Sequence, residues 1–303
     1  MKIAIFGGTG FIGRALAAYL VREGSEVVVV SRKSENRGSH SVASGLIHCT
    51  WSELERDLSP LSDVQAIVNL AGASLNQRWT PKARRIILES RLTTTRKVAQ
   101  FAAALSPGPE VVVQASAVGI YGTSLTGEFT EAAQRTEGNG DFLREVTERW
   151  EAAAKQGIPD RRLILLRTGV VLGNDGGAYP LMRLPFRLGF GGKVGTGRQW
   201  VPWIHLNDLV RLIDFCLKNP AMAGPVNAVS PFPVTNEQFS AVLGRVHRTP
   251  SWFPVPASLL KLLLGDISML LLEGQKVIPA AALEAGFQFI HPGLQEALAD
   301  LHA

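Results

Sequence analysis

Cysteine, tyrosine and histidine are scarce in this chain of 303 residues. It has two cysteines, three tyrosines and six histidines, and the cysteines, Cys49 and Cys216, lie far apart in the sequence. Two distant cysteines exclude the disulfide framework of a small secreted protein and favour a reducing compartment. Because the histidines and cysteines show no ligand spacing, we expect no bound metal.

Long hydrophobic runs are absent too. The most leucine-rich segment, residues 259–272, is interrupted by Lys261, Gly265 and Asp266. A membrane-spanning helix needs about 20 predominantly apolar residues, so we expect a pair of core helices here instead. A core strand begins by residue 3, which leaves no room for a secretory leader. We therefore predict a cytoplasmic protein with no membrane partner.

Charge of one sign does not dominate the chain. Its 31 basic and 26 acidic residues give a formal net charge of +5, and the cations are scattered rather than arranged in a stripe. The signatures of common nucleic-acid-binding folds are missing, so we expect no nucleic-acid partner. A mild positive charge suits an anionic small molecule equally well.

The amino terminus carries the most informative pattern. An apolar strand over residues 2–6 runs into three spaced glycines, an amphipathic helix over residues 11–23 follows, and a second strand covers residues 26–30. A strand, glycine turn, helix and strand in this order form the unit that binds a dinucleotide. The residues of the turn that we expect to bind the cofactor are Gly7, Gly8, Thr9, Gly10, Phe11, Ile12 and Gly13.

Each glycine of the turn has a physical reason. Gly7 and Gly8 allow a sharp turn where a Cβ would clash, Gly10 allows close approach to a pyrophosphate, and Gly13 allows the helix to lie tight against the strand. The start of the helix offers unpaired N–H groups to phosphates. The alternative is a tight strand–helix turn that holds no ligand.

The end of the second strand bears on which dinucleotide binds. NAD sites usually have Asp or Glu there, whereas this chain has Ser31, Arg32 and Lys33, with no carboxylate before Glu35. Ser31 can donate a hydrogen bond to a 2′-phosphate and Arg32 can bind it with two. One or two such bonds would favour NADP over NAD by about tenfold to a few hundredfold. The alternative is an ordinary basic surface turn from Ser31 to Arg37.

Alternation of strands and helices continues to about residue 170. We expect strands over residues 66–70, 110–115, 162–167 and 225–229, and helices over residues 81–105, 142–156 and, capped by Asn207 or Asp208, up to residue 218. This pattern predicts an α/β fold with a doubly wound parallel sheet of Rossmann type and a smaller, mostly helical C-terminal lobe. We place the nucleotide domain at residues 1–170 plus about 200–229, and the other lobe at 171–199 and 230–303.

Motifs along the whole chain resemble the short-chain dehydrogenase/reductase superfamily, in its extended, epimerase-like branch. The glycine turn, residues 69–72 and residues 203–209 are similar to that branch. Further motifs resemble its atypical subgroup of epimerase family proteins, which has a C-terminal domain of unknown function. These motifs are residues 31–33, 89–91, 116–122, 150–154, 169–173, 272–277 and 286–289.

The resemblance implies a domain that binds NADP(H) and a C-terminal lobe over the cofactor. Besides the glycine turn, the cofactor contacts that it implies are Ser31, Arg32, Leu70, Ala71 and Arg91. An alternative interpretation makes Arg91 a solvated helix cation that pairs with a neighbouring acid such as Glu89.

The chemistry usual in this superfamily is missing. Its members carry Tyr-x-x-x-Lys, in which the lysine and the cofactor lower the pKa of the tyrosine so that it can move a proton near neutral pH. None of the tyrosines here has a lysine four residues on: Tyr19 is followed by Glu23, Tyr121 by Leu125 and Tyr179 by Arg183.

Ser116 and Tyr121 are the candidates to replace that pair. Ser116 ends a strand at the sheet edge where ligands bind, and Tyr121 follows five residues later. One would hold a substrate hydroxyl and the other would act as acid or base. The alternative is that Ser116 bonds to the backbone and Tyr121 packs beside the nicotinamide. His205 lies in an apolar setting that favours a structural, hydrogen-bonded histidine.

Two functions from different classes follow from these residues. The first is an NADP(H)-dependent oxidoreductase or epimerase that acts on an unidentified small substrate with a hydroxyl or keto group. The second is a non-catalytic protein that senses NADP(H). The glycine-rich segment 173–198, with Arg183, Arg187, Lys193 and Arg198, is either a lid that binds an anionic substrate or a surface loop with solvated charges. Nothing in the sequence specifies the oligomeric state.

Overall fold

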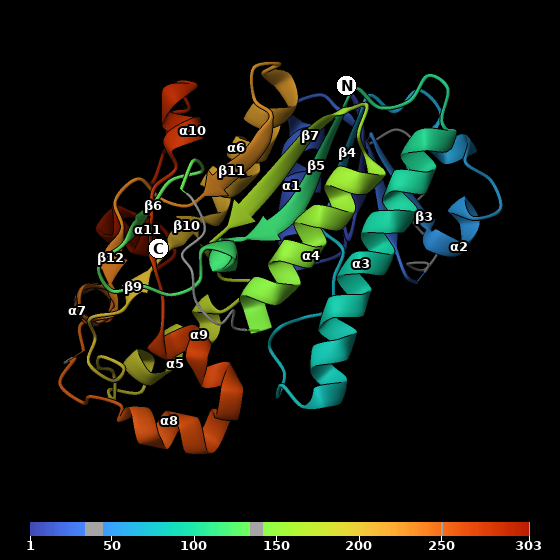
Figure 1. The fold of residues 1–303 in the computed structure, drawn as a ribbon. Helices are drawn as coiled ribbons and strands as arrows, with labels where there is room; N and C mark the ends of the chain where they lie inside the picture. Colours follow the sequence, from blue (N-terminus) through green and yellow to red (C-terminus); the bar gives the residue numbers. More distant parts are fainter. Residues whose placement is uncertain (34–44, 134–141, 250, 303) are drawn as a thin grey trace.

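A seven-stranded parallel sheet forms the centre of the molecule, in the order β11-β7-β5-β4-β1-β2-β3 (Figure 1). The computed structural model describes residues 1–33, 45–133, 142–249 and 251–302. The strands are nearly continuous apolar runs because helices cover both faces of the sheet. They are β1 (Lys2–Phe6), β2 (Glu26–Ser31), β3 (Leu46–Thr50), β4 (Ala66–Asn69), β5 (Val111–Ala117), β7 (Arg162–Thr168) and β11 (Gly224–Ala228).

Two layers of helices enclose this sheet. Helices α1 (Phe11–Arg22) and α6 (Leu206–Lys218) pack together on one face, and α3 (Pro81–Ala104) and α4 (Phe142–Gly157) on the other (Figure 1). Ile3 and Ile5 belong to the apolar cluster of the first face, and Ala4 and Phe6 to that of the second. Successive strand residues point to opposite faces, so one strand serves both layers. The predicted α/β fold with a doubly wound sheet of Rossmann type is confirmed.

The strand order places the expected ligand site. The chain moves outward from β1 in both directions, through β2 to β3 and through β4 to β5, β7 and β11. Open sheets of this kind bind ligands outside the carboxyl ends of the strands, where the order reverses. The glycine turn after β1 and the loop after β4 meet at this point.

A smaller, mostly helical region lies beyond the carboxyl ends of the strands (Figure 1). Its own core brings together α5, α7 and α11 around Tyr179, Trp203 and Phe239. Its helices are α5 (Tyr179–Arg187), α7 (Asn236–His247), α8 (Ala257–Leu264), α9 (Met269–Leu272), α10 (Ala280–Glu284) and α11 (Leu294–Asp300). Short strands join it to the sheet domain: β6 (Glu128–Phe129), β8 (Val170–Leu172), β9 (Trp200–Val201), β10 (Trp203–His205), β12 (Val234–Thr235) and β13 (Lys276–Val277).

The leucine-rich segment 259–272 departs from its prediction. It folds as α8 and α9, joined by a short 3-10 turn, but the helices do not form a buried pair. Leu259 and Leu262 of α8 are 45% and 77% exposed, so the prediction of core helices is wrong for these residues. Among the helices of the described ranges, none has the length and apolar character needed to cross a membrane. Strand β3 and helix α2 (Trp51–Leu54) were not predicted.

Candidate functional site

The glycine turn after β1 is shaped by two close backbone contacts. Gly7 has φ +81°, and a Cβ there would lie 2.9 Å from the backbone nitrogen of Ala71. A Cβ on Gly13 would lie 2.4 Å from the carbonyl oxygen of Gly7. These contacts confirm that Gly7 permits the turn and that Gly13 lets α1 lie against it. At Gly10 the nearest atom to such a Cβ is the oxygen of Gly7, at 3.2 Å.

The start of α1 is open to an anion. Its N-cap residue is Gly10, which offers no side-chain hydrogen bond to the first turn, and no acidic residue lies in that turn. The first N–H groups of such a helix are unpaired and carry a partial positive charge, which suits phosphate oxygens. Arg14 braces the turn by donating from Nη1 to the carbonyl oxygen of Thr9 at 2.7 Å.

The basic turn after β2 lies next to the glycine turn, because the amide of Gly7 donates to the carbonyl oxygen of Val30. Ser31 is buried and donates its hydroxyl hydrogen to the carbonyl oxygen of Lys33 at 2.5 Å. Arg32 is exposed and makes no ion pair within the described ranges. The rest of the predicted basic turn, as far as Arg37, lies outside the described residues.

Helix α3 holds the loop that follows β4 in place. The amide of Ala73 donates to the hydroxyl of Ser90, the hydroxyl of Thr94 donates to the carbonyl oxygen of Ala71, and Arg91 Nη1 donates to the carbonyl oxygen of Ala73. This loop, which includes Leu70 and Ala71, faces the glycine turn through the contact with Gly7 described above. The structure therefore brings the turn, the loop and Arg91 together.

Arg91 is a buried cation without a carboxylate partner in the described chain. Its side chain is 9% exposed, and its guanidinium lies 5.0 Å from the ring centroid of Trp150. Burial lowers the pKa of Arg91 from 12.5 to about 10. Glu89, its proposed surface partner, pairs instead with Arg85 at 2.8 Å, so the interpretation of Arg91 as a solvated, paired helix cation is wrong. An unpaired buried charge is costly, which favours an anionic ligand here.

Ser116 and Tyr121 are joined by a buried ion pair that the sequence did not lead us to expect. Ser116 Oγ donates to Glu151 Oε1 at 2.7 Å, and Arg167 binds both carboxylate oxygens of Glu151 at 2.8 and 3.0 Å. Arg167 Nη1 also donates to the hydroxyl of Tyr121 at 2.9 Å, and that hydroxyl donates to Asn227 Oδ1 at 2.7 Å. Both predicted catalytic hydroxyls thus have protein partners.

Burial and charge in this network shift the pKa values of Tyr121 and Arg167. Burial raises the pKa of Tyr121 above its ordinary value, although Arg167 opposes that change. Burial alone would lower the pKa of Arg167, but its hydrogen bonds and ion pair with Glu151 raise it instead. Tyr121 therefore remains a neutral phenol at physiological pH. The catalytic roles of Ser116 and Tyr121 stay predictions, and either role would require these hydroxyls to exchange partners.

Glu151, Arg167 and Asn227 were not predicted, because the motif usual in the superfamily consists of a tyrosine and a lysine. A signal was present: Arg167 follows an unbroken apolar run in a central strand, and a charge there needs a buried partner. Helix α4, which carries Glu151, contains no tyrosine. Thr147 of this helix donates to the carbonyl oxygen of Leu143.

Segments of the C-terminal region cover this sheet edge. Gly173, Gly176 and Gly177 pack on the ring of Phe11, where a Cβ would come within 2.7–3.0 Å. Gln275 Nε2 donates to the carbonyl oxygen of Val118 at 2.7 Å, which joins residues 272–277 to the loop after β5. Of the segment 173–198, residues 179–187 form α5 rather than a loop.

The four cations of that segment differ in their surroundings. Lys193 pairs with Glu237, and Arg183 donates to Asn174 and stacks on Tyr179. Arg187 and Arg198 are exposed.

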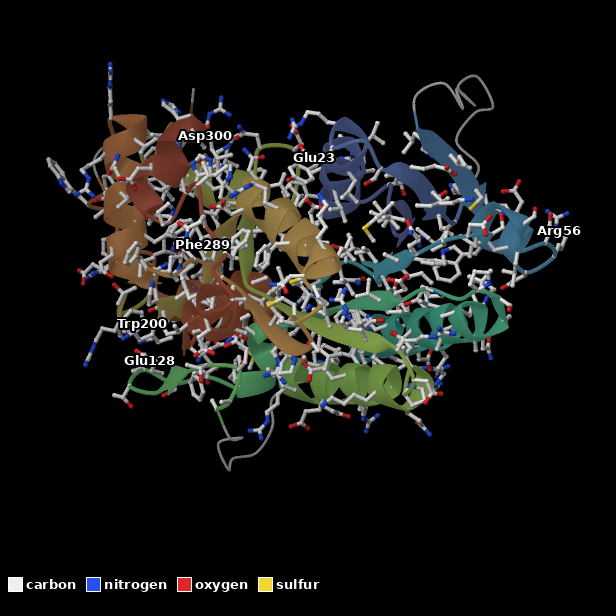
Figure 2. All side chains as sticks on the ribbon, turned by 90° about the horizontal axis from the view of Figure 1, so that it is seen from above. Glu23, Arg56, Glu128, Trp200, Phe289 and Asp300 are labelled. Carbon is white, nitrogen blue, oxygen red and sulfur yellow. The ribbon has the colours of Figure 1, made fainter. Side chains whose placement is uncertain are left out.

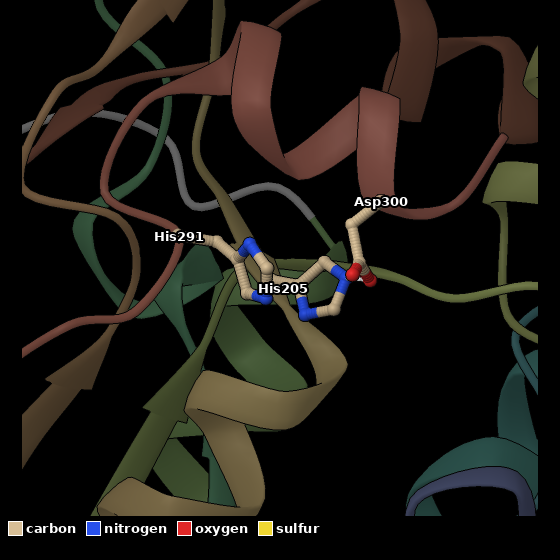
Figure 3. A group of neighbouring side chains, drawn as sticks. All are labelled: His205, His291 and Asp300. Carbon is tan, nitrogen blue, oxygen red and sulfur yellow. Dashed lines mark ion pairs between the residues drawn. The ribbon is translucent and has the colours of Figure 1, made fainter. Parts of the chain in front are cut away.

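A second polar cluster consists of His205, His291 and Asp300 (Figure 3). His205 caps α6, because its Nδ1 accepts the amide hydrogen of Asn207 at 3.2 Å, so the prediction of Asn207 or Asp208 as the cap is wrong. Asp208 instead accepts the amide hydrogens of Ile290 and His291, both at 2.8 Å. The prediction of a structural, hydrogen-bonded His205 is confirmed by this cap.

One ligand atom of each of these three side chains lies within 4.8 Å of the others, and the cap of α6 fixes the tautomer of His205. Because Nδ1 accepts a hydrogen bond, the ring proton lies on Nε2, which is buried 3.3 Å from Asp300 Oδ2 outside good hydrogen-bond geometry. A histidine bound to a metal through Nε2 carries its proton on Nδ1, and α6 would then lose its cap. Two effects lower the pKa of His205 from 6.5 to about 4: the larger is burial, and the smaller is repulsion from the neighbouring His291.

Comparisons with known proteins agree with this geometry. Residues 3–229 match the NAD dependent epimerase/dehydratase family, and residues 255–301 match a domain of unknown function, DUF1731. Epimerase family protein YfhF of Bacillus subtilis is 38% identical over 100% of this chain and 98% of its own length. Epimerase family protein SDR39U1 of Mus musculus is 39% identical over the full length of both chains.

A solved structure extends the likeness to three dimensions. The crystal structure of human epimerase family protein SDR39U1 (isoform2) with NADPH superposes with a TM-score of 0.90, at 38% identity, over 100% of this chain and 99% of that chain. Both the nucleotide domain and the C-terminal region are included in that match. The chain therefore belongs to the NAD dependent epimerase/dehydratase family, among the epimerase family proteins that end in the domain of unknown function.

Proposed function

We propose that this chain binds NADP(H) and uses it as an oxidoreductase or epimerase-like enzyme on a small substrate with a hydroxyl or keto group. The observation that carries the proposal is the meeting of three features at one sheet edge. They are a glycine turn with an open helix N-terminus, an exposed cation after β2, and the buried, unpaired Arg91. Each of them suits one part of a dinucleotide with an additional phosphate.

Each part of the cofactor has its own binding residues in this proposal. The amides at the start of α1 bind the pyrophosphate, with Gly7 to Gly13 giving it room. Arg32 binds the 2′-phosphate, and Ser31 joins it when its hydroxyl turns away from the carbonyl oxygen of Lys33. Leu70 and Ala71 border the pocket next to the glycine turn, and Arg91 contributes positive charge beneath it. The relative crystallised with NADPH supports the same choice of cofactor.

The chemistry that the bound cofactor supplies is transfer of a hydride to or from a substrate carbon. The chain's own part is to position the substrate and to supply or remove a proton. We propose Ser116 and Tyr121 for this part, with the Glu151–Arg167 ion pair fixing where each hydroxyl lies. The mildly positive net charge of +5 suits a substrate that carries an anionic group. Two free, buried thiols, Cys49 and Cys216, suit a cytoplasmic location.

Titration of the purified protein with NADPH and NADH tests the cofactor. We expect NADPH to bind more tightly by about tenfold to a few hundredfold, the range that one or two charged hydrogen bonds supply. Equal affinities would remove the basis for assigning Arg32 to a 2′-phosphate.

The second candidate function is an NADP(H)-binding sensor without turnover. It is favoured by the partners that Ser116 and Tyr121 have inside the protein and by a helix α4 without the Tyr-x-x-x-Lys pair. Incubation of the protein and NADPH with sugar nucleotides and small carbonyl compounds distinguishes the two. Oxidation of NADPH that Tyr121→Phe slows without weakening NADPH binding supports the enzyme. Tight NADPH binding with no turnover of any compound supports the sensor.

A further inference from the structure

Large apolar side chains gather on the outer surface of the C-terminal region. Leu188 and Phe190, just after α5, are 62% and 65% exposed, and Trp252 is 79% exposed. Leu262 of α8, at 77%, is almost as exposed as Trp252. We call this surface the basic apolar face, and its apolar members are Leu184, Leu188, Phe190, Trp252, Phe253, Leu259 and Leu262.

These side chains come from two segments that lie side by side. Phe190 and Phe253 have ring centroids 6.0 Å apart, and Gly192 pairs with Trp252 in an isolated bridge. The amide of Val255 donates to the carbonyl oxygen of Lys193 at 2.9 Å, which extends the pairing toward α8. Helices α5 and α8 lie at the same end of the molecule in Figure 1. Residues 190–193 and 252–255 are therefore neighbours, with α8 at the same end of the molecule, and exposed apolar side chains gathered in this way mark an interaction site.

The charge of these two segments has one sign. Residues 176–200 and 245–265 contain seven lysines and arginines and no aspartate or glutamate. Lys193 pairs with Glu237, but Arg187, Arg198, Arg245, Arg248 and Lys261 are exposed and make no ion pair within the described ranges. The net charge of the whole chain is only +5, so this concentration is local.

Exposed apolar side chains together with an excess of cations indicate which kind of partner this face can bind. In a two-fold dimer formed through this face, each copy would set its cations against the same cations of the other copy, which disfavours self-association. A nucleic acid would neutralise the charges but would leave leucines next to a polar backbone. An anionic lipid surface satisfies both, because phosphates meet the cations while leucine and aromatic side chains enter the boundary of the acyl chains.

We propose that the basic apolar face binds the chain peripherally to the surface of an anionic lipid bilayer. The expectation of no membrane partner rested on the length needed to span a bilayer, and a face that lies on the surface needs no such length. The proposal does not depend on the cofactor or on turnover. It accounts for why Leu259 and Leu262, expected in a core, are exposed.

Co-sedimentation of the full chain with vesicles tests this proposal. We expect binding to phosphatidylcholine vesicles that contain about one third phosphatidylglycerol, and little binding to phosphatidylcholine alone. Higher salt should weaken the binding, because the attraction between charges near the surface is screened. Light scattering without lipid should give a single species whose size does not depend on protein concentration.

Two double variants probe the two parts of the face. Arg187→Gln with Lys261→Gln should weaken binding to the anionic vesicles by roughly 25-fold, at about fivefold for each cation. Trp252→Ser with Leu262→Ser should weaken it at least about tenfold through lost apolar burial. All four side chains are exposed, so the variants should keep the melting temperature of the wild type.

Control variants remove charge or apolar area elsewhere, and the arginine pair matches the two charges lost from the face. Arg22→Gln with Arg56→Gln lowers the net charge by the same amount far from this face, since Arg22 ends α1 and Arg56 lies at the opposite end of the molecule (Figure 2). Leu283→Ser alters an exposed leucine of α10, which lies away from α8. These controls should bind vesicles like the wild type.

Three results would overturn the proposal. The first is no binding to either kind of vesicle. The second is an equal loss of binding in Arg22→Gln with Arg56→Gln, which would show attraction by net charge alone. The third is concentration-dependent dimerisation that Trp252→Ser with Leu262→Ser abolishes, which would make the face an interface between copies of the chain.

Discussion

Replacement of Arg91 by methionine separates a ligand-binding cation from a structural one. Methionine keeps much of the apolar length that packs on Trp150 but removes the charge. If Arg91 is held in readiness for an anionic ligand, the variant should bind NADPH less tightly while the free protein remains nearly as stable as the wild type. If Arg91 is structural, the variant should be less stable than the wild type and should bind NADPH equally tightly.

The structure gives the size of both effects. Burial lowers the pKa of Arg91 from 12.5 to about 10, which puts the cost of the unpaired charge at about 3 kcal/mol. The side chain offsets this cost through two hydrogen bonds, to the carbonyl oxygens of Ala73 and Ile87, because a bond from a charged donor contributes about 1.5–3 kcal/mol. These terms nearly cancel, so we expect the stability of the free protein to change by at most about 1–2 kcal/mol. Loss of one charged contact to the cofactor should raise the Kd for NADPH about tenfold to a hundredfold.

The assay combines urea unfolding without cofactor and calorimetric titration with NADPH. Arg85→Met is the matched control, because Arg85 lies on the same helix with a side chain that is 78% exposed and paired with the exposed Glu89. That control should change neither quantity measurably. A loss of more than about 3 kcal/mol in the free Arg91→Met protein, with unchanged affinity for NADPH, would refute the reasoning.

Three further predictions concern other parts of the site. Gly13→Ala should lower the free energy of unfolding in urea by about 3 kcal/mol or more, because its Cβ would lie 2.4 Å from the oxygen of Gly7. Gly24→Ala is the control: Gly24 has a left-handed backbone with open space around it, and the change should cost about 1 kcal/mol. Glu151→Gln should cost about 3–5 kcal/mol by the same measurement because it leaves Arg167 buried without its counter-charge, and a loss below about 1 kcal/mol would contradict the buried ion pair. His205 has a pKa of about 4 when folded and 6.5 when unfolded, so between these values the unfolded state binds more protons and stability falls as pH falls from about 6.5 to 4. His205→Asn, which keeps a capping side chain, should flatten that part of the profile of melting temperature against pH, and an unchanged profile would argue against a neutral, buried His205.

The nucleotide turn could be predicted from the sequence because its causes are local. The contacts of Gly7 and Gly13 arise within one strand–turn–helix unit, and the spacing of the glycines already contains them. The parallel sheet was predictable for a related reason, since continuous apolar strands that alternate with helices have few ways to fold.

The Glu151–Arg167 ion pair could not be predicted in the same way. Its members lie in α4 and β7, and only the packing of that helix on the sheet shows that Ser116 and Tyr121 join the same network. The cap of α6 depended on a detail of side-chain direction, which placed His205 rather than Asn207 over the first turn. Hydrophobicity alone gave no indication that α8 would lie at the surface, because an apolar helix buries itself only where another element covers it.

The ratio of the NADPH and NADH dissociation constants, measured for the wild type and for Arg32→Asp, tests the central claim most directly. The account predicts that the wild type prefers NADPH by about tenfold to a few hundredfold, and that the aspartate, which repels the 2′-phosphate and accepts hydrogen bonds from a free ribose, abolishes or reverses that preference. A variant that still prefers NADPH as strongly as the wild type would contradict the assignment of this turn to the phosphate.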